Sequence, residues 1–277
     1  MPDPQMPQPS EPFDRDTSFI ETDDGVIAAE VIGEGPPVVM LHPLALAGRV
    51  WGPVADRLAQ RFRVVTVDVR GHGESTWSGE PFSMTDLADD VTAVLDALEL
   101  ESAHLVGMSM GGSIAVTFAG LNPHRVGRLL LADTTAWYGE DAVATWNDRA
   151  EKALAVPREK QVPFQTERWF TEEFKKNAPE EVRRVVDVFL ATDSRVHAVA
   201  SRAMGRLDSR ALLGDVIAPT LVLTGEEDYA TPPEMGRFIA EHVKDGRAAT
   251  LPHLRHLSLI ERPSLSDVIA AHFEDDA

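Results

Sequence analysis

The sequence predicts an α/β fold, in which a mostly parallel sheet of eight strands carries helices on both faces. Short apolar or β-branched runs alternate with amphipathic stretches along most of the 277 residues, and this alternation is typical of parallel strands joined by helical crossovers. Residues 38–41 are apolar on both sides, as a central strand of such a sheet should be. The alternation stops over residues 137–213, which show helical patterns and no strand, so we expect an inserted helical lid there.

The chain before the first strand is expected to be a disordered arm. Residues 1–16 contain five prolines and almost no apolar periodicity, a composition that does not support a packed core. Order is expected from Thr17. Residues 18–21 and 26–32 then form two short strands around Asp24-Gly25, a dipeptide that favours tight hairpin turns.

The rest of the core follows in alternation. Ser83, with Asp86 three residues later, resembles a capping box that opens a helix through residue 98. Apolar spacing predicts further helices over residues 51–61, 110–121, 233–242 and 263–273. The other strands are expected over residues 38–41, 64–67, 103–106, 126–132, 220–224 and 248–251. We therefore expect a core of residues 17–136 and 214–277, and a lid over 137–213 with helices at 146–154, 163–176 and 179–190.

Composition excludes several classes of function. The chain has no cysteine, which excludes disulfides, thiolate metal sites and a cysteine nucleophile. A net charge of −19 argues against nucleic acid as a partner, because nucleic-acid-binding surfaces are basic. No apolar run is long enough for a membrane span and no signal peptide is visible, so we expect a cytoplasmic protein. Without a metal cluster, phosphate loop or dinucleotide fingerprint, no cofactor is expected.

The negative charge lies outside the expected lid. Residues 137–213 hold 13 basic and 13 acidic residues, so the whole net charge of −19 belongs to the rest of the chain. One interpretation is a solubilising acidic surface around a neutral insertion. The other interpretation is that the neutral lid repels anions less than the acidic core does, and covers a site that admits an anionic substrate. Both interpretations stay open at this point.

The strongest signal of chemistry is the G-x-S-x-G pattern at residues 107–111. It directly follows the strand of 103–106 and precedes the helix of 110–121, which is the setting of a nucleophile elbow. A turn this tight needs small neighbours. It also places Ser109 at a helix N-terminus, whose N–H groups stabilise an oxyanion. The alternative, an incidental serine in a glycine-rich turn, is disfavoured by the flanking elements.

A nucleophilic serine needs a base and a group that orients this base. Among nine histidines, His256 is our candidate base because it lies in a loop after the last strand, and His253 is its competitor. Asp228 is the candidate acid. It follows the strand of 220–224, at the sheet edge where parallel sheets place their ligands. Its rivals are Asp133, which we rank second, Glu226 and Glu227.

An oxyanion hole needs two donors, which are expected from two backbone N–H groups. The loop after residues 38–41 is placed to supply one of them. Pro43 has no N–H, so Leu44 should be the donor of this loop. The N–H of Met110, at the start of the helix after the nucleophile, should be the second.

The chain resembles the α/β-hydrolase superfamily from about Thr17 to the C-terminus. The order Ser109, Asp228, His256 is the triad order of these enzymes. Residues 42–51, 68–75, 107–112, 225–228 and 256–263 carry the resemblance along the core. In the lid, WNDR at 146–149, RWFT at 168–171 and VFLAT at 188–192 are similar to the 3-oxoadipate enol-lactonase group.

The resemblance implies a serine hydrolase that cleaves a small-molecule ester or lactone through an acyl-enzyme, without a cofactor, in aromatic catabolism. An anionic lactone would need a cation, for which Arg149 is our candidate, with Trp146 and Trp169 as apolar walls. A broad carboxylesterase, a C–C bond hydrolase and a cofactor-free perhydrolase would use the same triad. A non-hydrolytic receptor on this fold is the alternative of another class. The oligomeric state is left open.

Overall fold

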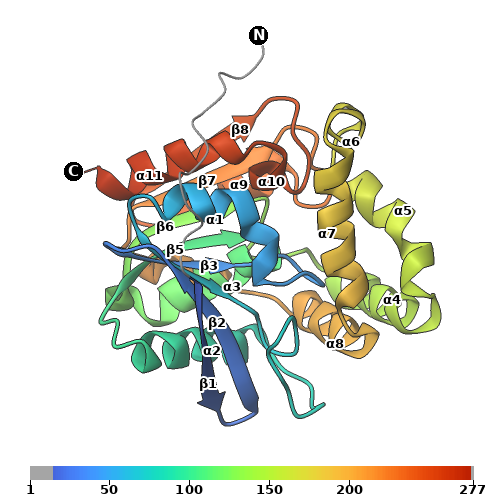
Figure 1. Ribbon diagram of the computed structural model, residues 1–277, viewed down its shortest axis with the longest axis horizontal. Coiled ribbons are helices and arrows are strands. Elements are labelled where there is room, and N and C mark those ends of the chain that lie inside the picture. Colours follow the sequence, from blue (N-terminus) through green and yellow to red (C-terminus); the bar gives the residue numbers. More distant parts are fainter. Residues whose placement is uncertain (1–14, 276–277) are drawn as a thin grey trace.

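An eight-stranded sheet forms the centre of the computed structural model, which describes residues 15–275 (Figure 1). The strands are β1 (Arg15–Thr22), β2 (Gly25–Ile32), β3 (Pro37–Leu41), β4 (Arg63–Val67), β5 (Ala103–Met108), β6 (Val126–Ala132), β7 (Thr220–Gly225) and β8 (Gly246–Leu251). Their order in the sheet is β1-β2-β4-β3-β5-β6-β7-β8. β2 is antiparallel to β1 and β4, and the other neighbouring pairs are parallel. The predicted fold class is therefore confirmed.

The first hairpin begins earlier than the sequence suggests. Residues 1–14 of the expected arm lie outside the described residues. Arg15 and Asp16, which fall within the predicted arm, pair with Ile32 and Val31 in the β1–β2 ladder. The prediction was wrong for these two residues because a backbone ladder needs N–H and C=O groups rather than apolar side chains.

The core helices are α1 (Gly52–Leu58), α2 (Met84–Ala97), α3 (Met110–Leu121), α9 (Pro233–His242), α10 (Ser258–Glu261) and α11 (Ser266–Glu274). α1 and α11 pack together on one face of the sheet, and α2 and α3 pack together on the other (Figure 1). The predicted capping box of α2 is present, because Ser83 and Asp86 exchange side-chain and backbone hydrogen bonds. α1 stops three residues before the predicted end, since the chain must turn into β4 at Arg63.

The inserted segment folds into five helices, drawn at the right of Figure 1. They are α4 (Ala142–Ala155), α5 (Arg158–Trp169), α6 (Glu172–Asn177), α7 (Pro179–Ala191) and α8 (Ser194–Gly205). The helix predicted over 163–176 is wrong, because Pro163 lies inside α5 and the chain breaks after Trp169. Thr171 starts α6 instead, as its hydroxyl accepts the N–H of Phe174 at 3.2 Å.

The end of the lid falls close to the predicted boundary. A 3-10 helix over Arg210–Asp215 crosses residue 213 and packs against α3 of the core. Trp137 and Asp208 form an isolated antiparallel bridge where the segment leaves and rejoins the core. We therefore propose that the lid begins at Trp137, as expected, and ends before Arg210.

Candidate active site

The candidate nucleophile lies at the turn between β5 and α3. Ser109 has φ 56° and ψ −119°, a left-handed backbone conformation that is strained for a residue other than glycine. Neighbouring glycines permit this turn. A Cβ on Gly107 would overlap the carbonyl of Gly111, and a Cβ on Gly111 would overlap the carbonyl of Leu41. The backbone therefore has the form expected of a nucleophile elbow.

Ser109, His256 and Asp228 form a hydrogen-bonded chain. His256 Nε2 lies 2.9 Å from Ser109 Oγ, and His256 Nδ1 lies 2.8 Å from Asp228 Oδ2. Oδ1 of Asp228 accepts the N–H groups of Ala230 at 2.8 Å and Thr231 at 3.1 Å, and Oδ2 accepts the Thr231 hydroxyl at 2.7 Å. Because an ionised carboxylate only accepts, Nδ1 carries the imidazole proton and Nε2 is left to accept from the serine.

The electrostatics of the chain suit these roles. Burial would raise the pKa of Asp228, but the charge of His256 and the hydrogen bonds from His256 and Thr231 outweigh it and lower this pKa. Burial lowers the pKa of His256; Asp228 opposes that shift, and the nearby charges of Arg168 and Arg149 reinforce it. At neutral pH, Asp228 is therefore ionised and His256 is a neutral base.

The rival residues are placed differently. Asp133 is fully buried, and its carboxylate accepts from the N–H of Gly225 at 2.9 Å and from the N–H and hydroxyl of Ser258 at 2.9 and 2.6 Å. Burial, and then the charge of Asp228, raise the pKa of Asp133 well above its ordinary value. Asp133 thus ties the end of β7 to the start of α10 and does not bond His256. Glu226, Glu227 and His253 are exposed.

The two candidate oxyanion donors have no competing acceptor in the part of the chain that the structure describes. Met110 is the first residue of α3, so its N–H has no partner within the helix. The N–H of Leu44 has no hydrogen-bond partner among residues 15–275. His42 holds the Leu44 loop, because its Nε2 accepts from Val69 N–H at 2.9 Å and its Nδ1 donates to the Pro43 carbonyl at 2.8 Å. Burial lowers the pKa of His42 to about 4, so the ring stays neutral as these bonds require.

A small cavity lies between the candidate nucleophile and the lid. Six of the site residues predicted from the sequence line this cavity: Leu44, Ser109, Trp146, Arg149, Trp169 and His256. Three further lid residues line it as well: Gln165, Arg168 and His197. The cavity measures about 20 Å³, room for about one water molecule, so lid side chains must move to admit a substrate. Arg168 directly precedes Trp169 in the RWFT motif, so this motif could have indicated it. A lone glutamine or histidine on a lid helix gave no signal.

Two arginines of this cavity lack an ion-pair partner among the described residues. Neither Arg149 nor Arg168 forms a hydrogen bond or a salt bridge with a described residue. Burial lowers the pKa of Arg149, and the charge of Arg168 lowers it further, yet an arginine keeps its proton in proteins. The Arg149 guanidinium lies over the Trp146 ring, 4.5 Å from its centroid. Trp146, Arg149 and Arg168 also line an outer hollow of about 400 Å³. These three side chains therefore lie between the outer hollow and Ser109.

The lid is fastened to the loop that carries His256. Glu261 accepts from the N–H and hydroxyl of Thr171 at 2.9 and 2.7 Å, and from the N–H of Arg255 at 2.8 Å. The Trp169 carbonyl accepts the N–H of Leu257 at 3.1 Å. The corner between α5 and α6 and the loop of the base are therefore held as one unit.

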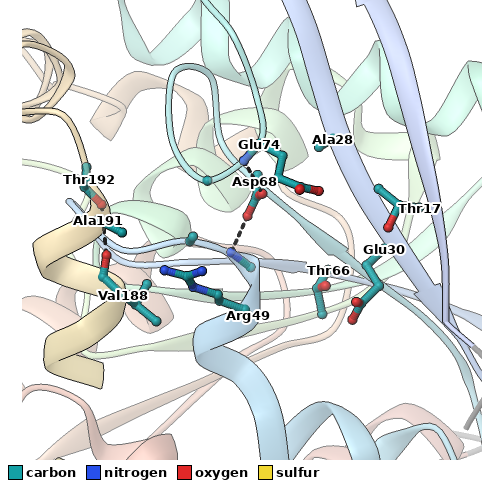
Figure 2. A pocket seen from close by; sticks show the side chains of 13 residues that line it. Thr17, Ala28, Glu30, Arg49, Thr66, Asp68, Glu74, Val188, Ala191 and Thr192 are labelled. Atoms are coloured by element: carbon teal, nitrogen blue, oxygen red, sulfur yellow. Dashed lines mark hydrogen bonds between the residues drawn. The ribbon is translucent and has the colours of Figure 1, made fainter. Parts of the chain in front are cut away.

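A second cavity, of about 290 Å³, lies between α7, the loop after β3 and the first strands of the sheet (Figure 2). It shares no lining residue with the catalytic cavity and contains none of the predicted site residues. Asp68 in its wall accepts the N–H groups of Gly48 at 2.6 Å and Glu74 at 2.8 Å. This carboxylate therefore serves to hold two loops together.

Two further features are absent from residues 15–275. No cluster of three or more histidine, aspartate or glutamate side chains is arranged to hold a metal ion. Over the same residues, the helices fall short of the length and apolar character that a bilayer crossing demands.

The known proteins that this chain resembles include lactonases and an esterase. The chain is 31% identical to 3-oxoadipate enol-lactonase 1 of Acinetobacter baylyi over 229 residues, which cover 82% of this chain and 84% of that protein. It is 32% identical to a pimeloyl-(acyl-carrier protein) methyl ester esterase of Chromobacterium violaceum, over 90% and 98% of the two chains. The enol-lactonase structure from Burkholderia xenovorans superimposes with a TM-score of 0.88 at 28% identity, over 93% and 100% of the chains.

The family itself is shown by a match that spans most of the chain. The family model described as the alpha/beta hydrolase fold matches residues 36–263, which include the elbow, the lid and the loops of Asp228 and His256. The relatives named above are hydrolases, and the predicted similarity to 3-oxoadipate enol-lactonases is confirmed. The chain is a member of the α/β-hydrolase family.

Proposed function

We propose that this protein is a serine hydrolase that cleaves an ester or lactone carbonyl through an acyl-enzyme intermediate. The observation that carries the proposal is the hydrogen-bonded chain from Ser109 through His256 to Asp228. It starts at a strained turn beside two backbone N–H groups without competing acceptors. The enol-lactonase and ester-hydrolase relatives support the same class of bond.

The mechanism follows from the positions of these groups. Ser109 Oγ attacks the carbonyl carbon while His256 Nε2 takes its proton, and Asp228 stabilises the resulting imidazolium. The N–H groups of Leu44 and Met110 would receive the oxyanion, which contributes about 3–4 kcal/mol per donor in sites of this kind. His256 then protonates the leaving oxygen, which stays tethered to the acyl chain when the substrate is a lactone. A water deprotonated by His256 finally releases the carboxylic acid.

The substrate in this proposal carries a carboxylate. Arg149 and Arg168 are half-buried and form no ion pair with a described residue, so a carboxylate beside them would accept charge-assisted hydrogen bonds. Trp146 and Trp169 would form the apolar walls beside the acyl chain. The lid also has equal numbers of acidic and basic residues, so the acidic core does not exclude an anionic ligand. By its name, 3-oxoadipate enol-lactonase 1 acts on a lactone of this class.

A fluorophosphonate probe tests the proposal, because it forms a covalent bond only with an activated serine. We expect stoichiometric labelling of the wild-type protein at Ser109, seen by intact mass and by peptide mapping. The Ser109→Ala variant is the control and should remain unlabelled. Labelling should be accompanied by hydrolysis of para-nitrophenyl acetate.

The receptor alternative gives a different result in the same experiment. A pocket that only binds a ligand has no need of an activated serine, so Ser109 would stay unlabelled and the ester intact. A panel of esters, lactones and vinylogous diketones then separates the hydrolytic alternatives. Our proposal requires the highest kcat/KM on a carboxylated ester or lactone.

A further inference from the structure

One histidine of the catalytic cavity has a tautomer fixed by its surroundings. His197 on α8 is buried and lines the cavity together with Ser109. Its Nδ1 lies 3.3 Å from a guanidinium nitrogen of Arg158. An arginine can only donate, so Nδ1 must accept. A neutral ring that accepts at Nδ1 carries its proton on Nε2, and Nε2 has no partner among residues 15–275.

Arg158 is itself held firmly in place. Its Nε donates to the Phe189 carbonyl at 2.8 Å, and one of its terminal nitrogens donates to the same oxygen. The guanidinium carbon lies 3.8 Å from the centroid of the Phe189 ring. Burial, and then the charges of Arg158 and Arg149, lower the pKa of His197 well below its ordinary value. The ring therefore stays neutral beside two cations.

A second polar side chain shares the cavity without a partner. Gln165 on α5 is 5% exposed and lines the same space, yet its amide forms no hydrogen bond with a described residue. Polar groups that face a cavity are normally hydrogen-bonded by the protein or by what the cavity contains. Two such groups with free capacity, on two different lid helices, can therefore bind a molecule that enters this cavity.

We propose that His197 Nε2–H and the Gln165 amide, which line the same cavity, form a neutral hydrogen-bonding subsite for a second oxygen of the substrate, separate from its carboxylate. This inference rests on the proposed hydrolase function and adds to it. The arginines would recognise the charge of the acyl chain, and the neutral pair would recognise a ketone oxygen on that chain. The substrate class is then an oxo-substituted carboxylic ester or lactone.

Matched para-nitrophenyl esters test this subsite. The series consists of the hexanoate and two analogues that differ from it only by a ketone at the fourth or the fifth acyl carbon. We expect the wild-type enzyme to favour one of the oxo esters over the hexanoate in kcat/KM by about three- to tenfold, the worth of one neutral hydrogen bond. His197→Phe keeps a ring of similar size but removes the donor, so it should reduce this ratio to about one, whatever change it causes in the rate on the hexanoate itself.

A second variant separates recognition from packing. His197→Gln returns an N–H donor near the place of Nε2, and it should restore most of the oxo preference. A wild-type ratio of one for both oxo esters would overturn the subsite without any variant, and so would an oxo preference that survives His197→Phe. Failure to hydrolyse any ester of the series would instead defeat the proposed hydrolase, and the subsite with it.

Discussion

The core and the lid differ in how their polar side chains are satisfied. In the core, Ser109, His256 and Asp228 bond one another, and the remaining capacity of Asp228 is filled by Ala230 and Thr231. In the lid, four side chains that line the same cavity have polar atoms without a partner among residues 15–275. These are Arg149, Gln165, Arg168 and His197.

This difference suggests that the core carries out the reaction and the lid selects the substrate. The core groups are oriented before any ligand arrives, which is the condition for electrostatic stabilisation of a transition state. The lid groups are partly or largely buried and have no partner among the described residues, so we propose that a ligand completes their hydrogen bonds. We therefore expect core substitutions to lower kcat on every substrate, and lid substitutions to change the ranking of substrates.

Removing the nucleophile should have the largest effect. Ser109→Ala should lower kcat on every ester and lactone by about 10⁴-fold or more, because no other described hydroxyl contacts His256 Nε2. The melting temperature should change little, since the Ser109 hydroxyl makes one bond only. Initial rates under substrate saturation, with thermal unfolding as the folding control, measure both quantities. Retention of a tenth of the wild-type rate would refute the assignment.

Exchanging the two buried carboxylates for amides should give the next largest effect. Asp228→Asn should lower kcat by about 10³–10⁴-fold, because an amide does not hold the imidazole tautomer. Asp133→Asn is the matched control, since its amide oxygen still accepts from Gly225 or Ser258, and its activity should fall by far less. Rates that fall equally in both variants would mean that Asp133 shares the role of the acid.

Loosening the link between the two regions should cost stability. Glu261→Ala removes the acceptor of three hydrogen bonds from Thr171 and Arg255, which should lower the free energy of unfolding by about 2 kcal/mol. Because the base and the lid corner loosen together, rates on charged and neutral esters should fall in the same proportion. Denaturant titration and paired kinetics measure this. A change confined to one substrate class would show that the link serves only the lid.

The smallest expected effect is on the pH profile. Catalysis needs neutral His256, so kcat/KM should be lost as pH falls through the pKa of this ring. Burial lowers that pKa, so activity should persist into mildly acidic buffer. Arg168→Gln removes a positive charge that lowers the pKa, so the midpoint of the acid limb should move to higher pH. A midpoint that moves to lower pH would contradict the geometry.

Much of the core could be predicted because its signals are local. The G-x-S-x-G pattern requires its own strand and helix, and Asp228 and His256 follow strands whose ends meet at one sheet edge. The choice of Asp228 over Asp133 was harder from sequence. Both follow neighbouring strands, and only the hydrogen bonds to Ser258 and Gly225 show that Asp133 is committed elsewhere.

The lid was less predictable because its contacts are long-range. The sequence predicts a helix that starts at Pro163, whereas α5 begins at Arg158 and contains the proline. His197 lies 39 residues from Arg158, whose guanidinium fixes its tautomer. Periodicity cannot show a pairing of this kind, which depends on how α5 and α8 pack in space.

If the lid selects the substrate and the core reacts with it, one ratio of rates should depend on the lid alone. The ratio is kcat/KM for the para-nitrophenyl monoester of adipic acid over that for para-nitrophenyl hexanoate, which differ by a terminal carboxylate. Arg149→Ala should reduce this ratio by about tenfold or more, the worth of a charge-assisted hydrogen bond, with the hexanoate value nearly unchanged. Equal losses on both esters would contradict the account.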